Sequence, residues 1–229
     1  MSNVFVKVLQ MDIKSSFYFT YVMLFTTGTI TLIEALRTKT PYVRHVMNLE
    51  TCISIVAAFF YGIFVKKIEA WSERDAKFDY EELTRIRYND WMITTPIMLL
   101  VLSIVLANEN KKEAHLWLYL VVAMLDIAML VLGYMGEVHT MNKGVSAVAS
   151  FACFVAIFAL VFMQFMGRGS PKVAWVTFAV FVVVWSMYGV VYFWDEEKKN
   201  IAYNTLDVIA KCFVGLFFWA YFGKVINFA

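Results

Sequence analysis

Seven apolar stretches, each about as long as a bilayer-spanning helix, follow one another along the chain. They cover residues 15–33, 46–65, 87–107, 116–135, 144–166, 173–194 and 200–222. Lipid offers the backbone no hydrogen-bond partners, so such stretches must satisfy their own N–H and C=O groups as helices. The predicted fold is therefore an all-α membrane protein, a seven-helix bundle surrounded by the lipid bilayer. No linker or repeat interrupts the pattern, which predicts one domain over residues 1–229.

The composition supports this class and argues against others. Hydrophobic residues make up 61% of the 229 residues, and the formal net charge of +2 includes no basic stripe suited to a nucleic-acid partner. The three cysteines lie in apolar stretches without C-x-x-C spacing and are predicted to be small core residues: Cys52, Cys153 and Cys212. No cluster of ligand residues predicts a metal site. Residues 1–16 lack the plan of a cleaved signal peptide, so the first apolar stretch is expected to direct insertion.

Four charged residues lie within two of the apolar stretches. The third stretch begins with RYNDWMITTP, which contains Arg87 and Asp90, and the seventh contains LDVIAKCFVG, with Asp207 and Lys211. A charge near the centre of a bilayer costs about 2.5–3.5 kcal/mol. Asp207 and Lys211 are four residues apart and share a helix face, as do Asp90 and Thr94. Two positive and two negative groups predict a neutral cluster between the third and seventh helices.

A buried lysine is a reactive amine that forms Schiff bases with aldehydes, and the resulting cation needs a carboxylate counter-ion. Aromatic and methionine side chains on other stretches could supply flat apolar walls for a long conjugated aldehyde: Trp91, Trp185, Tyr188, Met98 and Met129. The alternative is an ion-pair cluster that only fixes helix packing, with the aromatic residues as ordinary core.

These motifs resemble those of the microbial (type 1) rhodopsins, in whose third helix R-Y-x-D-W-x-x-T-x-P recurs. The stretch around Lys211 is similar to their seventh helix. WSMYGVVYF, residues 185–193, resembles the sixth-helix pocket motif of bacteriorhodopsin, and MLVLGYMGE, residues 129–137, is similar to the fourth helix of proteorhodopsins. The resemblance implies all-trans retinal as a Schiff base on Lys211. It also implies a homo-oligomer, a trimer or a pentamer, in the cell (plasma) membrane with its N-terminus outside.

The resemblance assigns roles residue by residue. Asp90 is expected to be the primary counter-ion and proton acceptor, Asp207 the second counter-ion, Arg87 a guanidinium that moves outward, and Thr94 a hydrogen-bond partner of the acceptor. The expected chromophore site also includes Trp91, Thr95, Met98, Met129, Gly133, Trp185 and Tyr188, with Tyr61 supporting Asp207 and Asp126 bonded to Thr95.

One departure from the family pattern affects the return of the proton. Val101 stands where efficient pumps carry Asp or Glu, which makes the third-helix motif Asp-Thr-Val. Glu50 is the expected displaced donor; the alternative is a solvated glutamate near the cytoplasmic interface.

Three other departures concern the sixth helix and the outer end. Gly189 replaces a sixth-helix proline, and Lys199 occupies one place of the extracellular release pair of bacteriorhodopsin. Glu196 and Glu197 are predicted to lie in a solvated loop.

The expected function is that of a photoreceptor and light-driven outward proton pump, and not that of an enzyme. A sodium pump is not expected, because that signature needs asparagine at position 90 and aspartate at position 94. A chloride pump would lack the acceptor carboxylate. The alternatives are a light-gated cation channel, since Thr95 and Asp126 correspond to a channelrhodopsin gate, and a sensory rhodopsin.

Overall fold

The computed structural model describes residues 12–74 and 76–226, and within these ranges the regular structure is entirely helical. The elements in chain order are α2 (Ile13–Arg37), α3 (Pro41–Glu73), α4 (Tyr80–Glu109), α5 (Leu116–Glu137), α6 (Lys143–Phe165), α7 (Lys172–Val191), α8 (Glu196–Asp207), the π-helical turn η1 (Val208–Phe213) and α9 (Val214–Phe222). Most of residues 1–16, where the absence of a signal peptide was predicted, lies outside the described ranges.

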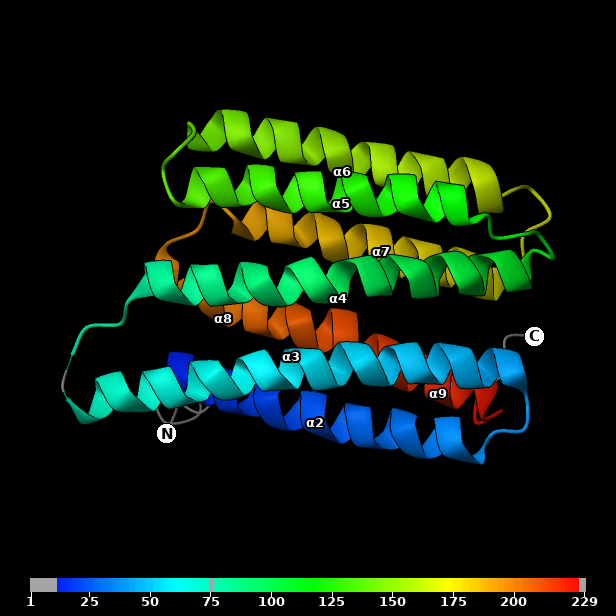
Figure 1. Cartoon of the computed structure of the whole chain (residues 1–229), viewed down its shortest axis with the longest axis horizontal. Coiled ribbons are helices and arrows are strands. Elements are labelled where there is room, and N and C mark those ends of the chain that lie inside the picture. The colour runs from blue at the N-terminus through cyan, green and yellow to red at the C-terminus, as the bar shows by residue number, and fades with distance from the viewer. Residues whose placement is uncertain (1–11, 75, 227–229) are drawn as a thin grey trace, which may run out of the picture.

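Seven helical spans are long and apolar enough to cross a membrane, which confirms the predicted fold class. Six are single helices, and the seventh runs without a break from α8 through η1 into α9, over residues 196–222. The spans lie roughly parallel and alternate in direction, so that α2 begins and α9 ends at opposite ends of the bundle (Figure 1).

The helices extend beyond the apolar stretches because polar residues cap them. The carboxylate of Asp79 accepts the backbone N–H of Glu82 at 2.9 Å, and α4 therefore begins at Tyr80 instead of at Arg87. As a result, Arg87 lies about two turns inside the helix. Asp195 caps α8 in the same way, so Glu196 and Glu197 form its first turn and the prediction of a loop there is wrong.

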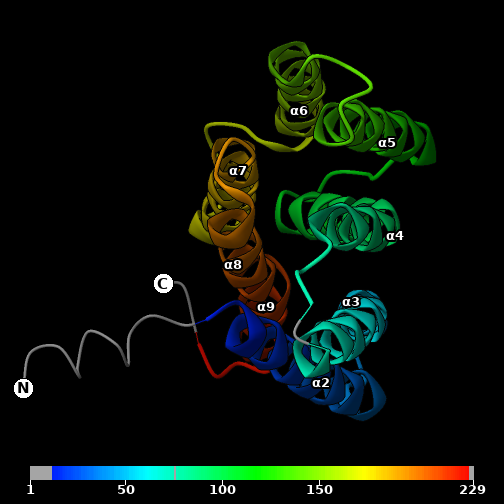
Figure 2. The same ribbon diagram turned by 90° about the vertical axis from the view of Figure 1, so that its left-hand side faces the viewer.

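Helix α4 lies at the centre of the bundle. Seen from one end, it is placed between α3 and α5 and faces the row formed by α7, α8 and α9, while α6 lies at the outer edge (Figure 2). In the most apolar 18 residues, 61% of α4 is buried but only 22% of α5 and of α6. The outer helices therefore present most of their apolar side chains to lipid.

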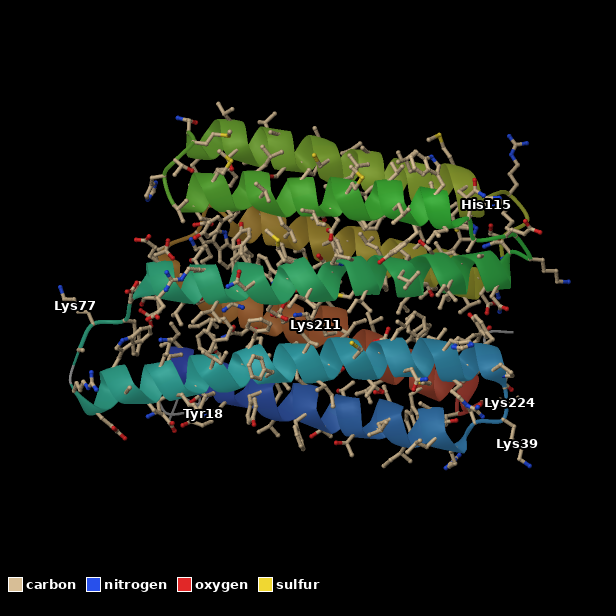
Figure 3. The ribbon with its side chains drawn as sticks, in the orientation of Figure 1. Tyr18, Lys39, Lys77, His115, Lys211 and Lys224 are labelled. Carbon is tan, nitrogen blue, oxygen red and sulfur yellow. The ribbon has the colours of Figure 1, made fainter. Side chains whose placement is uncertain are left out.

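Lys211 divides the bundle into two sides. It lies near the middle, with Lys77 at one end and Lys39 and Lys224 at the other (Figure 3). We call the half in which α2, α4, α6 and α8 begin the Arg87 side, and the half in which α3, α5 and α7 begin the Glu50 side, after one buried charged residue in each.

Lys211 belongs to the π-helical turn η1, a widened type of turn that is frequent at functional sites. Its neighbour Cys212 is buried, as predicted for a core residue, and Cys153 is half-buried. Cys52 instead lies on the exposed face of α3, where the prediction was wrong. Periodicity within an apolar helix does not separate a core-facing from a lipid-facing side when both faces are hydrophobic.

Candidate functional site

The side chain of Lys211 lies between the two carboxylates that the sequence placed with it. Its Nζ donates a hydrogen bond to Asp90 Oδ2 at 2.6 Å and lies 3.7 Å from Asp207 Oδ2. All three side chains are buried. Asp90 comes from α4, and the other two residues come from opposite ends of one helical turn at the α8–η1 junction. The predicted cluster between the third and seventh spans is therefore present in the structure.

The two carboxylates differ in how well they are satisfied. Asp207 accepts hydrogen bonds from Tyr61 at 2.8 Å, from Tyr188 at 2.7 Å and from the indole N–H of Trp91 at 3.3 Å. Asp90 has the short bond from Lys211 and a long one of 3.4 Å from Thr94. The hydroxyl of Thr94 also donates to the Asp90 backbone carbonyl at 2.9 Å. Three donors hold Asp207, whereas Asp90 depends mainly on the lysine.

Arg87 completes the charge balance and connects the cluster to the Arg87 side. Its Nη1 lies 3.6 Å from Asp207 Oδ2 and donates to the hydroxyl of Tyr61 at 3.1 Å. Its Nη2 donates to the side-chain oxygens of Asn200 at 3.1 Å and Asn204 at 2.8 Å. Aromatic rings surround the guanidinium within 6 Å, which suits a buried cation.

Neither asparagine was predicted as a site residue. Both lie on α8, and Asn204 also donates to the hydroxyl of Ser16 on α2 at 2.8 Å. A signal was present in the spacing, because Asn200, Asn204, Asp207 and Lys211 follow one another at intervals of three or four residues along one helix face.

A cavity of about 740 Å³ adjoins Lys211 and Asp207. Its walls include the seven residues that were predicted to line a chromophore: Trp91, Thr95, Met98, Met129, Gly133, Trp185 and Tyr188. Gly133 leaves room there, since an added Cβ would lie 3.0 Å from the Tyr88 hydroxyl. Phe151 and Phe154 of α6 also contribute to the wall. The remaining wall is mostly apolar, so Lys211 and Asp207 are the charged groups that it offers.

Tyr61 and Asp126 lie outside the cavity wall and act through other residues. Tyr61 bonds both Asp207 and Arg87, in agreement with a supporting position. Asp126, on α5, accepts a hydrogen bond from the Thr95 hydroxyl at 2.7 Å, while its Oδ1 has no hydrogen-bond partner among the described residues. This bond links α5 to α4 one helical turn beyond Asp90.

Glu50 is not part of the Lys211 cluster. It lies on the Glu50 side and is only 2% exposed, which contradicts the alternative of a solvated glutamate. Its Oε2 points at Gly215 of α9 and would be 3.1 Å from a Cβ at that position. Val101 is fully buried in the same half of the bundle, among the apolar residues of α4.

A second buried ionic group lies at the outer end of the Arg87 side. Lys199 Nζ donates at 2.7 Å both to Glu137 Oε2 and to Glu196 Oε1. The backbone carbonyl of Glu196 in turn accepts a hydrogen bond from the side-chain N–H of Asn200, which is also a partner of Arg87. Glu137 was not predicted, because its partner is distant in sequence and only the side-chain contact between the end of α5 and the start of α8 reveals it.

The arrangement as a whole defines a class: a seven-helix membrane protein with a buried lysine between two carboxylates at the wall of an apolar cavity. The chain belongs to the family of bacteriorhodopsin-like proteins, whose family model matches residues 12–225. It is thus a microbial rhodopsin embedded in the membrane as a multi-pass protein, as the motifs predicted.

Individual relatives agree with this assignment. The structure is similar to that of the viral rhodopsin OLPVRII, with a TM-score of 0.86 and 42% identity over 94% of this chain and 99% of that one. It also resembles a blue light-absorbing proteorhodopsin from Med12, with a TM-score of 0.75 and 20% identity over 93% and 99% of the two chains, which shows the shared fold. The green-light absorbing proteorhodopsin of the gamma-proteobacterium EBAC31A08 is 28% identical over 154 residues. That match spans 59% of this chain and 60% of the relative's length.

Proposed function

We propose that the chain binds all-trans retinal covalently through Lys211 and works as a light-driven outward proton pump. The observation that carries the proposal is the 2.6 Å contact between Lys211 Nζ and Asp90 Oδ2 at the wall of a large apolar cavity. A protonated lysine nitrogen and a buried carboxylate at this distance form a donor and acceptor pair for proton transfer.

The cavity suits this cofactor in size and chemistry. Its volume of about 740 Å³ lies within the usual range for sites that enclose a small organic ligand. Its walls are apolar and aromatic, and its reactive amine is Lys211. Bound retinal supplies the absorption of light and a change of shape that alters the direction and proton affinity of the lysine nitrogen.

Asp90 is the proposed acceptor because it is the less satisfied of the two carboxylates. Its negative charge depends on Lys211, so it can take up the proton when the lysine nitrogen releases it. Asp207 keeps its charge because three neutral donors and Arg87 stabilise it. Asp207 therefore serves as the second counter-ion and holds the lysine in place.

Arg87 is proposed to respond to the loss of charge between the carboxylates. Once Asp90 is neutral, the guanidinium is held less strongly toward the cluster and more by Asn200 and Asn204, which lie on the Arg87 side. Its displacement brings positive charge toward the outer end and favours release of a proton there.

The proton must return from the Glu50 side, where Val101 has no group to donate. We propose Glu50 as the donor, since it is a buried carboxyl between Lys211 and that end of the bundle. We also propose that the chain lies in the cell (plasma) membrane with its N-terminus outside. We further propose that it forms a homo-oligomer, a trimer or a pentamer.

A light-gated cation channel is the second candidate. The Thr95–Asp126 hydrogen bond of 2.7 Å joins α4 to α5 beside the cavity, where its rupture could open a path between the two helices. Val101, Leu102, Val105 and Leu106 favour the pump, because these fully buried apolar side chains obstruct a hydrated path on the Glu50 side.

The test is the light-induced current of a voltage-clamped cell that expresses the protein with retinal, recorded across membrane potential. We expect an outward current that keeps its sign at negative voltages. A current that reverses with the cation gradient would instead establish a channel. An intact visible absorption band without current would point to a sensor.

A further inference from the structure

The cavity beside Lys211 extends to the outer surface of the bundle. At its far end it is lined by Val148 and Phe151 of α6 and by Val190 of α7, which are 73%, 56% and 63% exposed. These residues lie in membrane spans, so the surface they share faces lipid. One continuous cavity therefore connects a fully buried lysine to the side of the protein.

The opening lies between α6 and α7, which are neighbours at the outer edge of the bundle (Figure 2). Its rim contains small residues from both helices, including Ala147 of α6 and Gly189 of α7. An added Cβ at Gly189 would meet no atom within 4 Å. The absence of a side chain at this position therefore keeps space free at the mouth of the cavity.

The routes along the bundle axis are closed to a large apolar molecule. On the Arg87 side, Arg87 with its asparagine and tyrosine partners fills the interior. On the Glu50 side, fully buried residues such as Val101 and Leu102 pack between the helices. The lateral opening is the route that the cavity itself provides.

We propose that the opening between α6 and α7 is the portal through which retinal reaches Lys211 from the lipid phase. The inference rests on the proposed binding of retinal and goes beyond it by assigning the route. A long apolar aldehyde partitions into the bilayer, and this opening lets it slide in with its aldehyde end first without crossing water or displacing a buried charge. Lys211 Nζ then bonds to the aldehyde carbon, and the aldehyde oxygen leaves as water with two of the three ammonium protons.

The experiment uses the full chain produced without retinal, held in lipid nanodiscs, and mixed with vesicles that contain all-trans retinal. The rate at which the visible absorption band appears reports arrival at Lys211. Gly189→Trp narrows the portal, and Val183→Trp is the matched control, because Val183 is 57% exposed on α7 but does not line the cavity. We expect Gly189→Trp to form the band about tenfold more slowly with an unchanged final amplitude, equivalent to about 1.4 kcal/mol of added barrier, and the control to match the parent.

Val148→Trp, on the opposite wall of the opening, is the second variant and should show the same delay if Gly189→Trp fails to fold. Equal rates in the parent, the folded narrowing variant and the control would overturn the portal while leaving retinal binding intact. An equal delay in the portal variants and in Val183→Trp would also overturn it, because bulk on the helix surface alone would then be the cause. Failure of the parent to form any band would instead reject the proposed function.

Discussion

The two sides of the bundle, separated by Lys211, differ in how hydrogen bonds connect their buried polar groups to the Lys211 cluster. On the Arg87 side, hydrogen bonds join the cluster through Arg87 and Asn200 to the ionic group of Lys199 at the outer end. On the Glu50 side, Val101 and Leu102 of α4 are fully buried and apolar, and Glu50 lies beside Gly215 of α9. For the proposed pump, the Arg87 side offers a series of hydrogen-bonded groups for proton release, whereas Glu50 must supply the returning proton on the other side. Such asymmetry gives a pump its direction.

The largest expected effect comes from removing the buried cation of the Arg87 side. Arg87→Gln removes the buried cation and leaves Asp207 and two asparagines without their charged partner. Because removal of one member of a buried ion pair leaves an uncompensated charge, we expect a loss of about 3–5 kcal/mol in the free energy of unfolding. Unfolding in mixed micelles measures it. Arg85→Gln is the matched control, since the Arg85 side chain is 63% exposed on the same helix, and equal losses in both variants would contradict the prediction.

Asp90→Asn removes the proposed acceptor without changing the size of the side chain. We expect the stationary light-driven current to fall about 100-fold, the lower range for loss of a positioned acid or base, while a retinal absorption band remains. Asp126→Asn, which alters a buried aspartate bonded to Thr95 and not to Lys211, should keep most of the current. A full current from Asp90→Asn would show that the proton leaves Lys211 by another acceptor.

Glu50→Gln tests the Glu50 side. We expect the late decay of the photocycle, followed by time-resolved absorption, to slow about tenfold because the only proposed proton donor there is lost. Glu34→Gln is a suitable control, since Glu34 is also buried on the Glu50 side but lies near Arg37 and the end of α2. Decay rates that remain unchanged over a range of pH would remove Glu50 from the proton path.

The smallest effect should follow from making the two sides more alike. Val101→Asp places a second carboxyl on the Glu50 side, and we expect it to speed the late decay by about threefold. In the Glu50→Gln background it should restore much of the lost rate. Val101→Asn carries the same bulk without an acidic proton and should restore nothing. Equal rescue by both variants would mean that hydration, and not proton donation, limits the return.

The cluster around Lys211 was predictable because its spacing within each helix is fixed by helical geometry. Asp207 and Lys211 share a face in any helix, and a charge at Arg87 or Asp90 inside an apolar stretch demands a partner. The helix limits were less accessible, because the capping residues Asp79 and Asp195 lie outside the hydrophobic pattern.

The missed residues depend on packing between helices that are distant in sequence. Glu137 and Lys199 are 62 positions apart and meet because α5 ends and α8 begins on the Arg87 side of the bundle. The burial of Glu50 likewise depends on the position of Gly215 on α9. The periodicity within one apolar stretch cannot predict such contacts between residues of different helices.

The π-helical turn around Lys211 also shifts the angular frame of the last span. Such a turn holds more residues than an α-turn, so every side chain of α9 points in a different direction from the one that an unbroken α-helix would assign. Gly215 faces Glu50 in this rotated frame. If residues 208–213 formed regular α-helix with no residue removed, the Arg87 side would stay in phase and the whole of α9 would turn away from its present neighbours. A deletion of one residue within 208–213 would instead remove the extra residue of the π-turn and leave α9 close to its present orientation.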